Sequence, residues 1–215
     1  MVKVRWHGHA CFEISTPEVT VVIDPHDGIS LGIKKPEVKA DIVLISHDHF
    51  DHNKDAVVAK PGAEILKMFR GEKEVRGVRI KGIETAHDDV GGRERGKNIV
   101  YVITVGEVTF CHLGDLGHIL TEDQVREIGA IDVLMIPVGG TYTIGPEEAK
   151  SIVKQLNPKV VIPMHYKIPG LQLPLLPVSH FLKYFEKVKK IDSNEIEITR
   201  ETLPAETTIY VLSPP

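Results

Sequence analysis

The sequence has few cysteines and no long apolar segment. Its two cysteines, Cys11 and Cys111, are too few for a disulfide scaffold or a cysteine-rich zinc module, and we expect both to be small buried side chains. No apolar run approaches the roughly 18–20 residues of a membrane span, and the N-terminus lacks an apolar stretch of signal-peptide length. The sequence therefore predicts a cytoplasmic protein with no membrane partner.

An excess of positive charge is also absent. The formal net charge is −4, so the chain as a whole offers no basic field for wrapping long nucleic acid, although a local basic patch is left open. Hydrophobic residues make up 42% of the chain and charged residues 26%, which is ordinary globular usage and excludes a disordered chain. We find no domain boundary and expect a single domain over residues 1–215, with the homo-oligomeric state left open.

Short strand-like runs recur along the whole chain. Strands are expected at Val2–Trp6, Cys11–Ser15, Val19–Asp24, Ile42–Ile45, Val78–Glu84, Ile99–Val105, Val108–Cys111, Val133–Ile136, Val160–Pro163, Glu195–Thr199 and Thr208–Leu212. The run Ile42–Ile45 is apolar throughout, which is typical of a strand buried on both faces. A hairpin turn is expected at Gly106 and Glu107.

Helices are expected between the later strands. A capping-box pattern that begins at Thr121 predicts a helix ended by Gly129. Pro146 suits the first turn of a second helix over Glu147–Leu156, and a third is expected from Ser179 through Lys190. Many strands with interspersed helices and no repeat predict an α/β or α+β layered fold.

Histidine, by contrast, is abundant. The chain has 11 histidines, and histidine is the commonest metal ligand among side chains. The strongest motif is His47-x-His49-x-Asp51-His52, directly after the expected strand Ile42–Ile45. His47 and His49 would point the same way because extended side chains alternate, so they could chelate one ion, and Asp51 and His52 fit a second. Such ligands suit zinc, iron, manganese or nickel, and the spacing does not choose among them.

Two ions need more ligands than this motif supplies, and the chain offers them after other strands. His87, Asp115 and His165 each lie just past the C-terminal end of an expected strand. The carboxyl end of the strands is a usual place for an active site in α/β proteins. One edge of the fold could therefore gather all these side chains.

These residues resemble the metallo-β-lactamase superfamily of hydrolases, whose ligand order matches the motif followed by His87, Asp115 and His165. Four further segments resemble a compact branch that includes L-ascorbate-6-phosphate lactonase and the UPF0173 metal-dependent hydrolases: Trp6–His9, Ile23–Pro25, His112–Asp115 and Pro163–Tyr166. The resemblance is specific for fold and metal site and weak for substrate.

The resemblance implies a four-layer αββα sandwich with a dinuclear metal site between its sheets at one edge. It implies that His47, His49 and His87 bind the first ion, that Asp51, His52 and His165 bind the second, and that Asp115 bridges them. We expect two divalent ions per chain, zinc first, with manganese, iron and nickel left open. The histidine at His49 argues against the flavodiiron branch, which has glutamate there. The lack of cysteine near His112–His118 argues against β-lactam hydrolysis.

Other residues are candidates for roles around the ions. Asp24 is expected to accept a hydrogen bond from a ligand imidazole, with turn formation as the alternative. His7 and His9 could contact substrate or donate a proton, unless they are core or capping histidines. His118 is a further candidate proton donor, whereas His112 is expected to support the site without binding an ion.

Two loops could also contribute. Arg93 and Arg95 lie in the glycine-rich segment Asp88–Asn98 and could clamp a phosphate, the alternative being an exposed charged loop. Tyr142 is a candidate for lining the pocket. The second loop, Ile168–Val178, is rich in proline and leucine, and long loops in compact domains are often lids or binding loops.

The expected chemistry follows from the ions. Two divalent ions roughly 3.5–4 Å apart can share a water and lower its pKa toward about 7, so hydroxide attack on a carbonyl carbon or phosphorus is expected. Asp51 would orient this nucleophile as well as bind metal, and His9, His118 or water could protonate the leaving group. The prediction is a metal-dependent hydrolase of a small anionic ester-like molecule, a lactone or a phosphodiester. The alternatives are a nuclease acting on RNA or single-stranded DNA, and a metal-binding scaffold or sensor without turnover.

Overall fold

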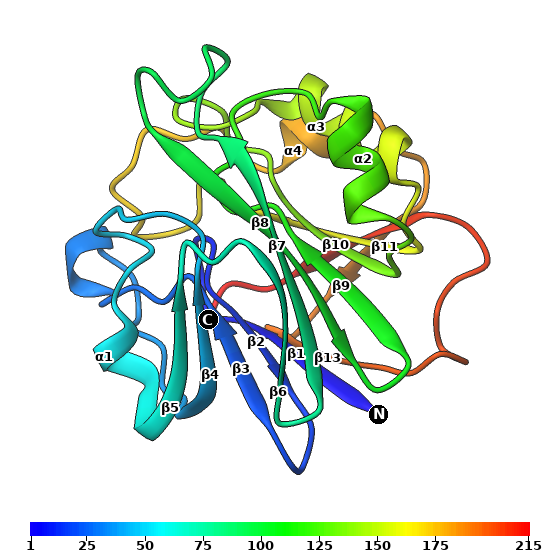
Figure 1. Cartoon of the computed structure of the whole chain (residues 1–215). Coiled ribbons are helices and arrows are strands. Elements are labelled where there is room, and N and C mark those ends of the chain that lie inside the picture. The colour runs from blue at the N-terminus through cyan, green and yellow to red at the C-terminus, as the bar shows by residue number, and fades with distance from the viewer.

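The computed structural model describes residues 1–215, which form two β-sheets packed face to face with short helices outside them (Figure 1). The six-stranded sheet has the order β13-β1-β2-β3-β4-β5, with β1 at Val2–Trp6, β2 at Phe12–Ser15, β3 at Thr20–Ile23, β4 at Ala40–Ile45, β5 at Ala59–Lys67 and β13 at Glu195–Ile198. The eight-stranded sheet has the order β12-β14-β11-β10-β9-β8-β7-β6, with β6 at Gly71–Val75, β7 at Val78–Ala86, β8 at Lys97–Val105, β9 at Val108–His112, β10 at Val133–Pro137, β11 at Val160–Met164, β12 at Val188–Ile191 and β14 at Thr208–Leu212. The helices are α1 at Asp55–Val58, α2 at Glu122–Ile128, α3 at Pro146–Leu156 and α4 at Ser179–Leu182, with a 3₁₀ turn, η1, at Ile29–Leu31.

The apolar core lies between the two sheets. Val2, Val4 and Trp6 of β1 are buried while the residues between them are half-buried, because successive side chains of a strand point to opposite faces. They belong to one cluster of 52 buried hydrophobic residues drawn from both sheets. Removal of this apolar surface from water is the main favourable term in folding.

Strand β4 is buried on both faces, as its unbroken apolar sequence predicts. Ile42 and Leu44 belong to the core between the sheets, whereas Val43 and Ile45 join a separate cluster with Val58 of α1. Helix α1 therefore covers the outer face of the six-stranded sheet, and α2 and α3 pack against β7 and β10 of the other sheet (Figure 1). This order of layers confirms the predicted αββα sandwich.

Two of the three predicted helices are confirmed. Thr121 accepts a hydrogen bond from the Gln124 N–H, the Gln124 side chain accepts one from the Thr121 N–H, and α2 ends at Gly129. Helix α3 begins at Pro146 and ends before Asn157, which has a left-handed backbone. None of the helices has both the length and the apolar composition that a membrane span requires.

The helix predicted over Ser179–Lys190 is wrong. Only Ser179–Leu182 is helical, as the single turn α4, and Val188–Ile191 forms strand β12 parallel to β14. Helical propensity is a weak preference, and pairing along the open edge of β14 outweighs it by completing backbone hydrogen bonds. Strands β5 and β6 were not predicted, because their residues are mostly exposed or half-buried and show little apolar alternation. The other predicted strands are present, with ends that agree within two residues.

Candidate metal centre

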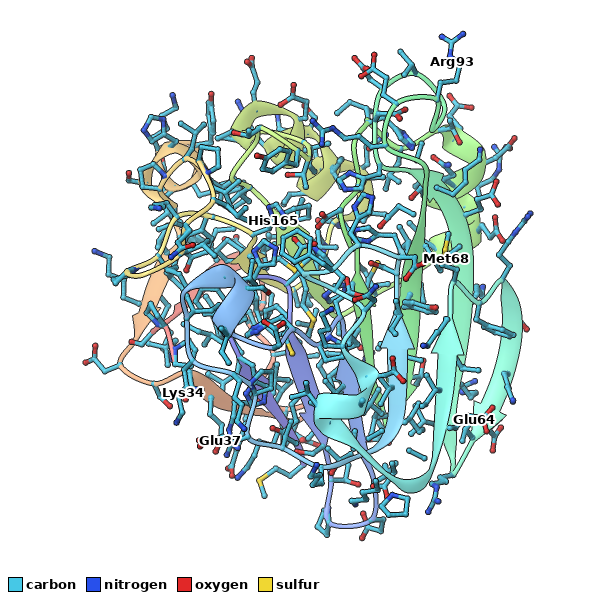
Figure 2. The ribbon with its side chains drawn as sticks, turned by 90° about the vertical axis from the view of Figure 1, so that its left-hand side faces the viewer. Lys34, Glu37, Glu64, Met68, Arg93 and His165 are labelled. Carbon is cyan, nitrogen blue, oxygen red and sulfur yellow. The ribbon has the colours of Figure 1, made fainter.

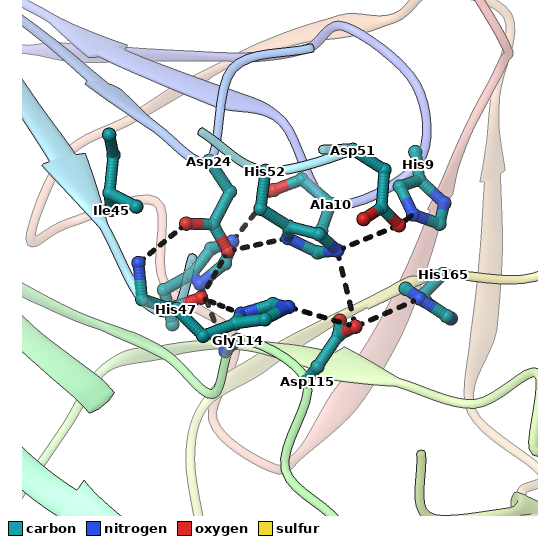
Figure 3. Close-up of polar contacts among 12 residues, drawn as sticks. His9, Ala10, Asp24, Ile45, His47, Asp51, His52, Gly114, Asp115 and His165 are labelled. Atoms are coloured by element: carbon teal, nitrogen blue, oxygen red, sulfur yellow. Dashed lines mark hydrogen bonds and ion pairs between the residues drawn. The ribbon is translucent and has the colours of Figure 1, made fainter. Parts of the chain in front are cut away.

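The candidate ligands follow four strands, one from the six-stranded sheet and three from the other. The motif His47–His52 follows β4, and His87, Asp115 and His165 follow β7, β9 and β11. Figure 3 shows the side chains of His47, His52 and His165 pointing toward that of Asp115. The structure therefore brings the seven predicted ligands to one place, although they are spread over much of the chain.

Asp115 lies at the centre of this cluster. Its Oδ2 atom is 3.4 Å from Nε2 of His47, 3.2 Å from Nε2 of His52, 3.2 Å from Nε2 of His87 and 3.3 Å from Nε2 of His165. N–H···O hydrogen bonds are about 2.7–3.2 Å long, most often about 2.9–3.0 Å. Two ligands at 2.0–2.1 Å from one tetrahedral ion stand roughly 3.4 Å apart. The spacing is thus closer to that of ligands around a cation than to that of hydrogen-bonded partners.

The possible ligand atoms form three groups, and within each group the atoms lie within 4.8 Å of one another: His47, His49 and His87; His9, Asp51, His52 and His165; and Asp24, His47 and His52. Asp24 of the third group accepts a hydrogen bond from His52 Nδ1, so the first two groups are the candidate ligand sets. The first group is the set expected for the first ion. The second is the set expected for the other ion with His9 added.

The buried unpaired atoms and the charged carboxylates of the cluster favour binding of a cation. His47 Nε2, His52 Nε2 and Asp115 Oδ1 are buried without a hydrogen-bond partner, which is costly unless something binds them. Burial opposes the charge of Asp51 and Asp115, but the neighbouring histidines outweigh it and hold both pKa values well below their usual range. Burial likewise opposes a charge on His52, yet Asp115, Asp51 and Asp24 raise its pKa well above the usual value. The residues present therefore fit a divalent-metal site.

Asp24 and Ser46 orient two of the imidazoles. The Oδ2 atom of Asp24 accepts hydrogen bonds from His52 Nδ1 at 2.9 Å and from the Ser46 hydroxyl at 2.6 Å. Ser46 Oγ in turn accepts one from His47 Nδ1 at 2.8 Å, on the tautomer that this network favours. With their protons on Nδ1, both rings turn the Nε2 lone pair toward Asp115 at the centre of the cluster. Asp24 thus has the contact expected of it, whereas Ser46 was given no role from the sequence.

His9 contacts a candidate ligand and not the pocket. It is fully buried, and its Nε2 donates a hydrogen bond to Asp51 Oδ2 at 2.8 Å. Burial and the proximity of His165 lower the pKa of His9 to about 3. The neutral, enclosed ring can position Asp51, but it cannot reach a substrate or donate its proton to a leaving group, which corrects that part of the prediction.

Two other histidines do not face the centre, and their predicted roles there are corrected. His7 Nε2 donates to Glu13 Oε2 at 3.0 Å, and His7 lines a separate hollow that holds none of the candidate ligands. His118 Nε2 accepts the Ala86 N–H at 3.1 Å, and its Nδ1 donates to the carbonyl of the next residue at 2.7 Å. Because the backbone engages both ring nitrogens, His118 is not available as a proton donor.

The turn that carries Asp115 is held by buried polar groups. His112 donates to the Ala10 carbonyl at 2.8 Å and accepts the Gly114 N–H at 3.1 Å, so it supports the turn as expected. Asn98 Oδ1 accepts the Asp115 N–H at 2.9 Å. Gly114 has φ +57°, and a Cβ there would overlap Asn98 Oδ1. Asn98 was not predicted as a site residue, and its one signal in the sequence is a polar side chain at the start of an apolar strand.

A pocket of about 330 Å³ opens onto the cluster. Its lining combines candidate ligands with Phe50, Arg95, Tyr142 and Leu173. Arg95 and Tyr142 therefore lie where the prediction put them. A larger hollow of about 480 Å³ over β6 and β7 holds none of the candidate ligands.

The loop Asp88–Asn98 is ordered beside this pocket. Burial opposes ionisation of Asp88, but four backbone N–H donors outweigh it and lower the pKa of this carboxyl to about 2. Arg93 of the same loop faces solvent, where its Nε donates to the Val90 carbonyl at 3.1 Å, so its predicted role as a phosphate clamp is not supported.

Comparison with known proteins agrees with this geometry. Residues 3–165 match the family described as Beta-lactamase superfamily domain. The chain is 37% identical over 191 residues to a UPF0173 metal-dependent hydrolase of Thermococcus onnurineus, covering 77% of this chain and 85% of that protein. It is 33% identical over 188 residues to one of Thermoplasma volcanium, with 77% and 83% covered. A Thermotoga maritima crystal structure of the metallo-β-lactamase superfamily has a TM-score of 0.81 and 44% identity over 99% of this chain and 98% of that one. The chain therefore belongs to the metallo-β-lactamase superfamily and is a metal-dependent hydrolase.

Proposed function

We propose that the chain hydrolyses a small anionic ester-like substrate, a lactone or a phosphodiester, at a centre of two divalent ions. The observation that carries this proposal is Asp115, whose Oδ2 faces four imidazole nitrogens at 3.2–3.4 Å. One ion would be held by His47, His49 and His87, the other by Asp51, His52 and His165, with Asp115 between them. The donors suit zinc, and also manganese, iron or nickel.

Two divalent ions held close together lower the pKa of a water and stabilise the oxyanion that forms when a carbonyl or phosphoryl centre is attacked. The chain positions the groups around them. Asp51, fixed by the His9 Nε2 proton, orients the attacking water from the wall of the pocket. Because His9 is enclosed and His118 faces elsewhere, water is the remaining proton donor among those predicted.

The pocket lining favours a small molecule over a nucleic acid. Arg95 is its one cationic side chain, and Phe50, Tyr142 and Leu173 supply apolar and aromatic surface. A nuclease groove needs several cations along the path of the phosphate backbone, to replace the counterions that the backbone releases. The two complete sets of donors in turn favour turnover over a scaffold or sensor.

The test is a substrate screen on metal-reconstituted protein with lactones, phosphodiesters and short oligonucleotides. We expect hydrolysis of a small substrate that chelator abolishes and added metal restores. Turnover of oligonucleotides alone would assign a nuclease instead. Metal-loaded protein that turns over none of the three classes would contradict the proposed function.

A further inference from the structure

Arg95 is a cation without an anionic partner at the edge of the metal centre. Its guanidinium carbon lies 4.8 Å from the centre of the Tyr142 ring, and both side chains line the pocket. The arginine ion pairs of the structure involve Arg5, Arg70, Arg126 and Arg200. A guanidinium carries five N–H donors in a planar fork that matches a carboxylate or a phosphate. The guanidinium lies over the face of the Tyr142 ring, and its N–H donors make no hydrogen bond to the protein.

The loop that carries Arg95 is fixed by the carboxylate of Asp88. Asp88 Oδ1 accepts the N–H groups of Val90 at 3.0 Å and Gly92 at 2.6 Å. Asp88 Oδ2 accepts those of Glu94 at 2.9 Å and Arg95 at 2.8 Å. A recognition group on a fixed loop gives up less conformational entropy on binding than one on a mobile loop. The hydrogen bonds of Asp88 therefore fix the backbone position of Arg95 beside the pocket.

We propose that Arg95 binds a second anionic group of the substrate, a carboxylate or a phosphate separate from the bond that is hydrolysed. The inference deepens the proposed function and rests on it, because the ester must lie at the metal centre while the anion reaches Arg95. His87 and Asp88 are adjacent, so the segment that supplies a candidate ligand also orders the anion site. Phe50 and Leu173 would contact the atoms between the two groups. The substrate class is thus an ester or lactone that bears its own carboxylate or phosphate.

Arg93 provides a matched control in the same loop. Both arginine side chains are exposed, but Arg93 does not line the pocket, and its Nε donates to the Val90 carbonyl at 3.1 Å. Figure 2 shows it projecting from the edge of the molecule, well away from His165. Arg93→Gln and Arg95→Gln therefore remove the same charge from one loop, outside the pocket and inside it respectively.

The test measures binding by calorimetry on metal-reconstituted protein, with equal metal content verified for each variant. The probes are linear dicarboxylates of increasing length, the monocarboxylates of equal length, and a parallel series of phosphonocarboxylates. None of them is an ester, so the result does not depend on turnover. We expect wild type to bind at least one diacid about tenfold more tightly than its monoacid, the effect of one charge-assisted hydrogen bond. Arg95→Gln should remove this preference, and Arg93→Gln should keep it.

Three results would overturn the proposal: no preference for a second anionic group in wild type, a preference that survives in Arg95→Gln, or an equal loss in Arg93→Gln. Either probe series can support it, and the tighter one identifies the group as carboxylate or phosphate. Metal-dependent hydrolysis of an uncharged ester would stand in any of these cases, so failure of the anion site is distinguishable from failure of the proposed function.

Discussion

The backbone N–H of His165 donates a hydrogen bond to the carbonyl oxygen of His9 at 3.1 Å, and the two rings lie 4.2 Å apart. The same carbonyl accepts the Trp6 indole N–H at 3.0 Å. Both histidines have left-handed backbones, with φ of 52° and 53°, which costs of order 1–3 kcal/mol for a residue other than glycine. Such strain persists only where the surrounding structure fixes it, and here it holds an N-terminal segment against a candidate ligand.

We expect His9→Leu to weaken binding of the second ion, because it removes the proton donor that holds Asp51. Loss of a partner that orients a ligand typically reduces metal affinity about 10–100-fold. His9→Gln has a similar size and keeps an N–H donor, so it should lose less. Metal titrations of the two variants and wild type measure the difference, and equal affinities for all three would exclude a positioning role for His9.

Replacing His87 and replacing His112 by alanine should have different effects on metal binding and on stability. His87→Ala should abolish metal binding at the first site, since His87 Nε2 faces Asp115 at 3.2 Å. His112→Ala should leave the metal content intact and lower stability, because it unpairs the buried Ala10 carbonyl and Gly114 N–H. Metal analysis and thermal unfolding of both variants check this, and the opposite pattern would mean that the third histidine is wrongly assigned.

Asp115→Asn should retain the shape of the turn but remove the negative charge between the two proposed ions. A neutral amide is a poorer bridge, so we expect weaker binding of at least one ion and a loss of turnover beyond the roughly 10–100-fold typical of residues behind the ligands. Metal content and kinetics are measured together on the same preparation. Near-normal metal content with turnover within a few-fold of wild type would show that Asp115 only shapes the turn.

His26 should make stability depend on pH outside the metal centre. It is buried, its Nε2 donates to the His7 carbonyl at 3.0 Å, and burial lowers its pKa from 6.5 to about 4. Between these values the unfolded chain binds a proton that the folded chain does not, so the free energy of unfolding falls as the pH falls. His26→Gln keeps a donor without titrating, and its stability should therefore depend less on pH. Urea denaturation of metal-free wild type and variant from about pH 4 to pH 7 tests this, with parallel profiles as the contrary result.

The sequence was most informative where metal-ligand side chains directly follow an apolar strand pattern. The run Ile42–Ile45 predicts a strand buried on both faces. The histidine and aspartate side chains of His47–His52 follow it closely, and such a cluster is typical of a metal site. His87, Asp115 and His165 could be proposed because each follows a recognisable strand, and the structure brings them to the same point. Local signals of this kind do not depend on distant parts of the chain.

The sequence was least informative about side-chain direction beyond a turn. His118 lies three residues after Asp115, yet its Nε2 accepts a hydrogen bond from the Ala86 N–H, which is distant in the sequence. His7 and His9 are two residues apart, but one contacts Glu13 and the other Asp51. These outcomes depend on which strands become neighbours, and the same holds for β12, whose pairing with β14 outweighs a helical pattern.

The central claim, a centre of two ions, is tested most directly by counting metal. Protein reconstituted with divalent zinc and freed of excess ion should contain close to two ions per chain, one for each group of donors, and should lose activity with chelator. The same count on His87→Ala should fall to about one. A count near zero in metal-supplemented wild type would contradict the account.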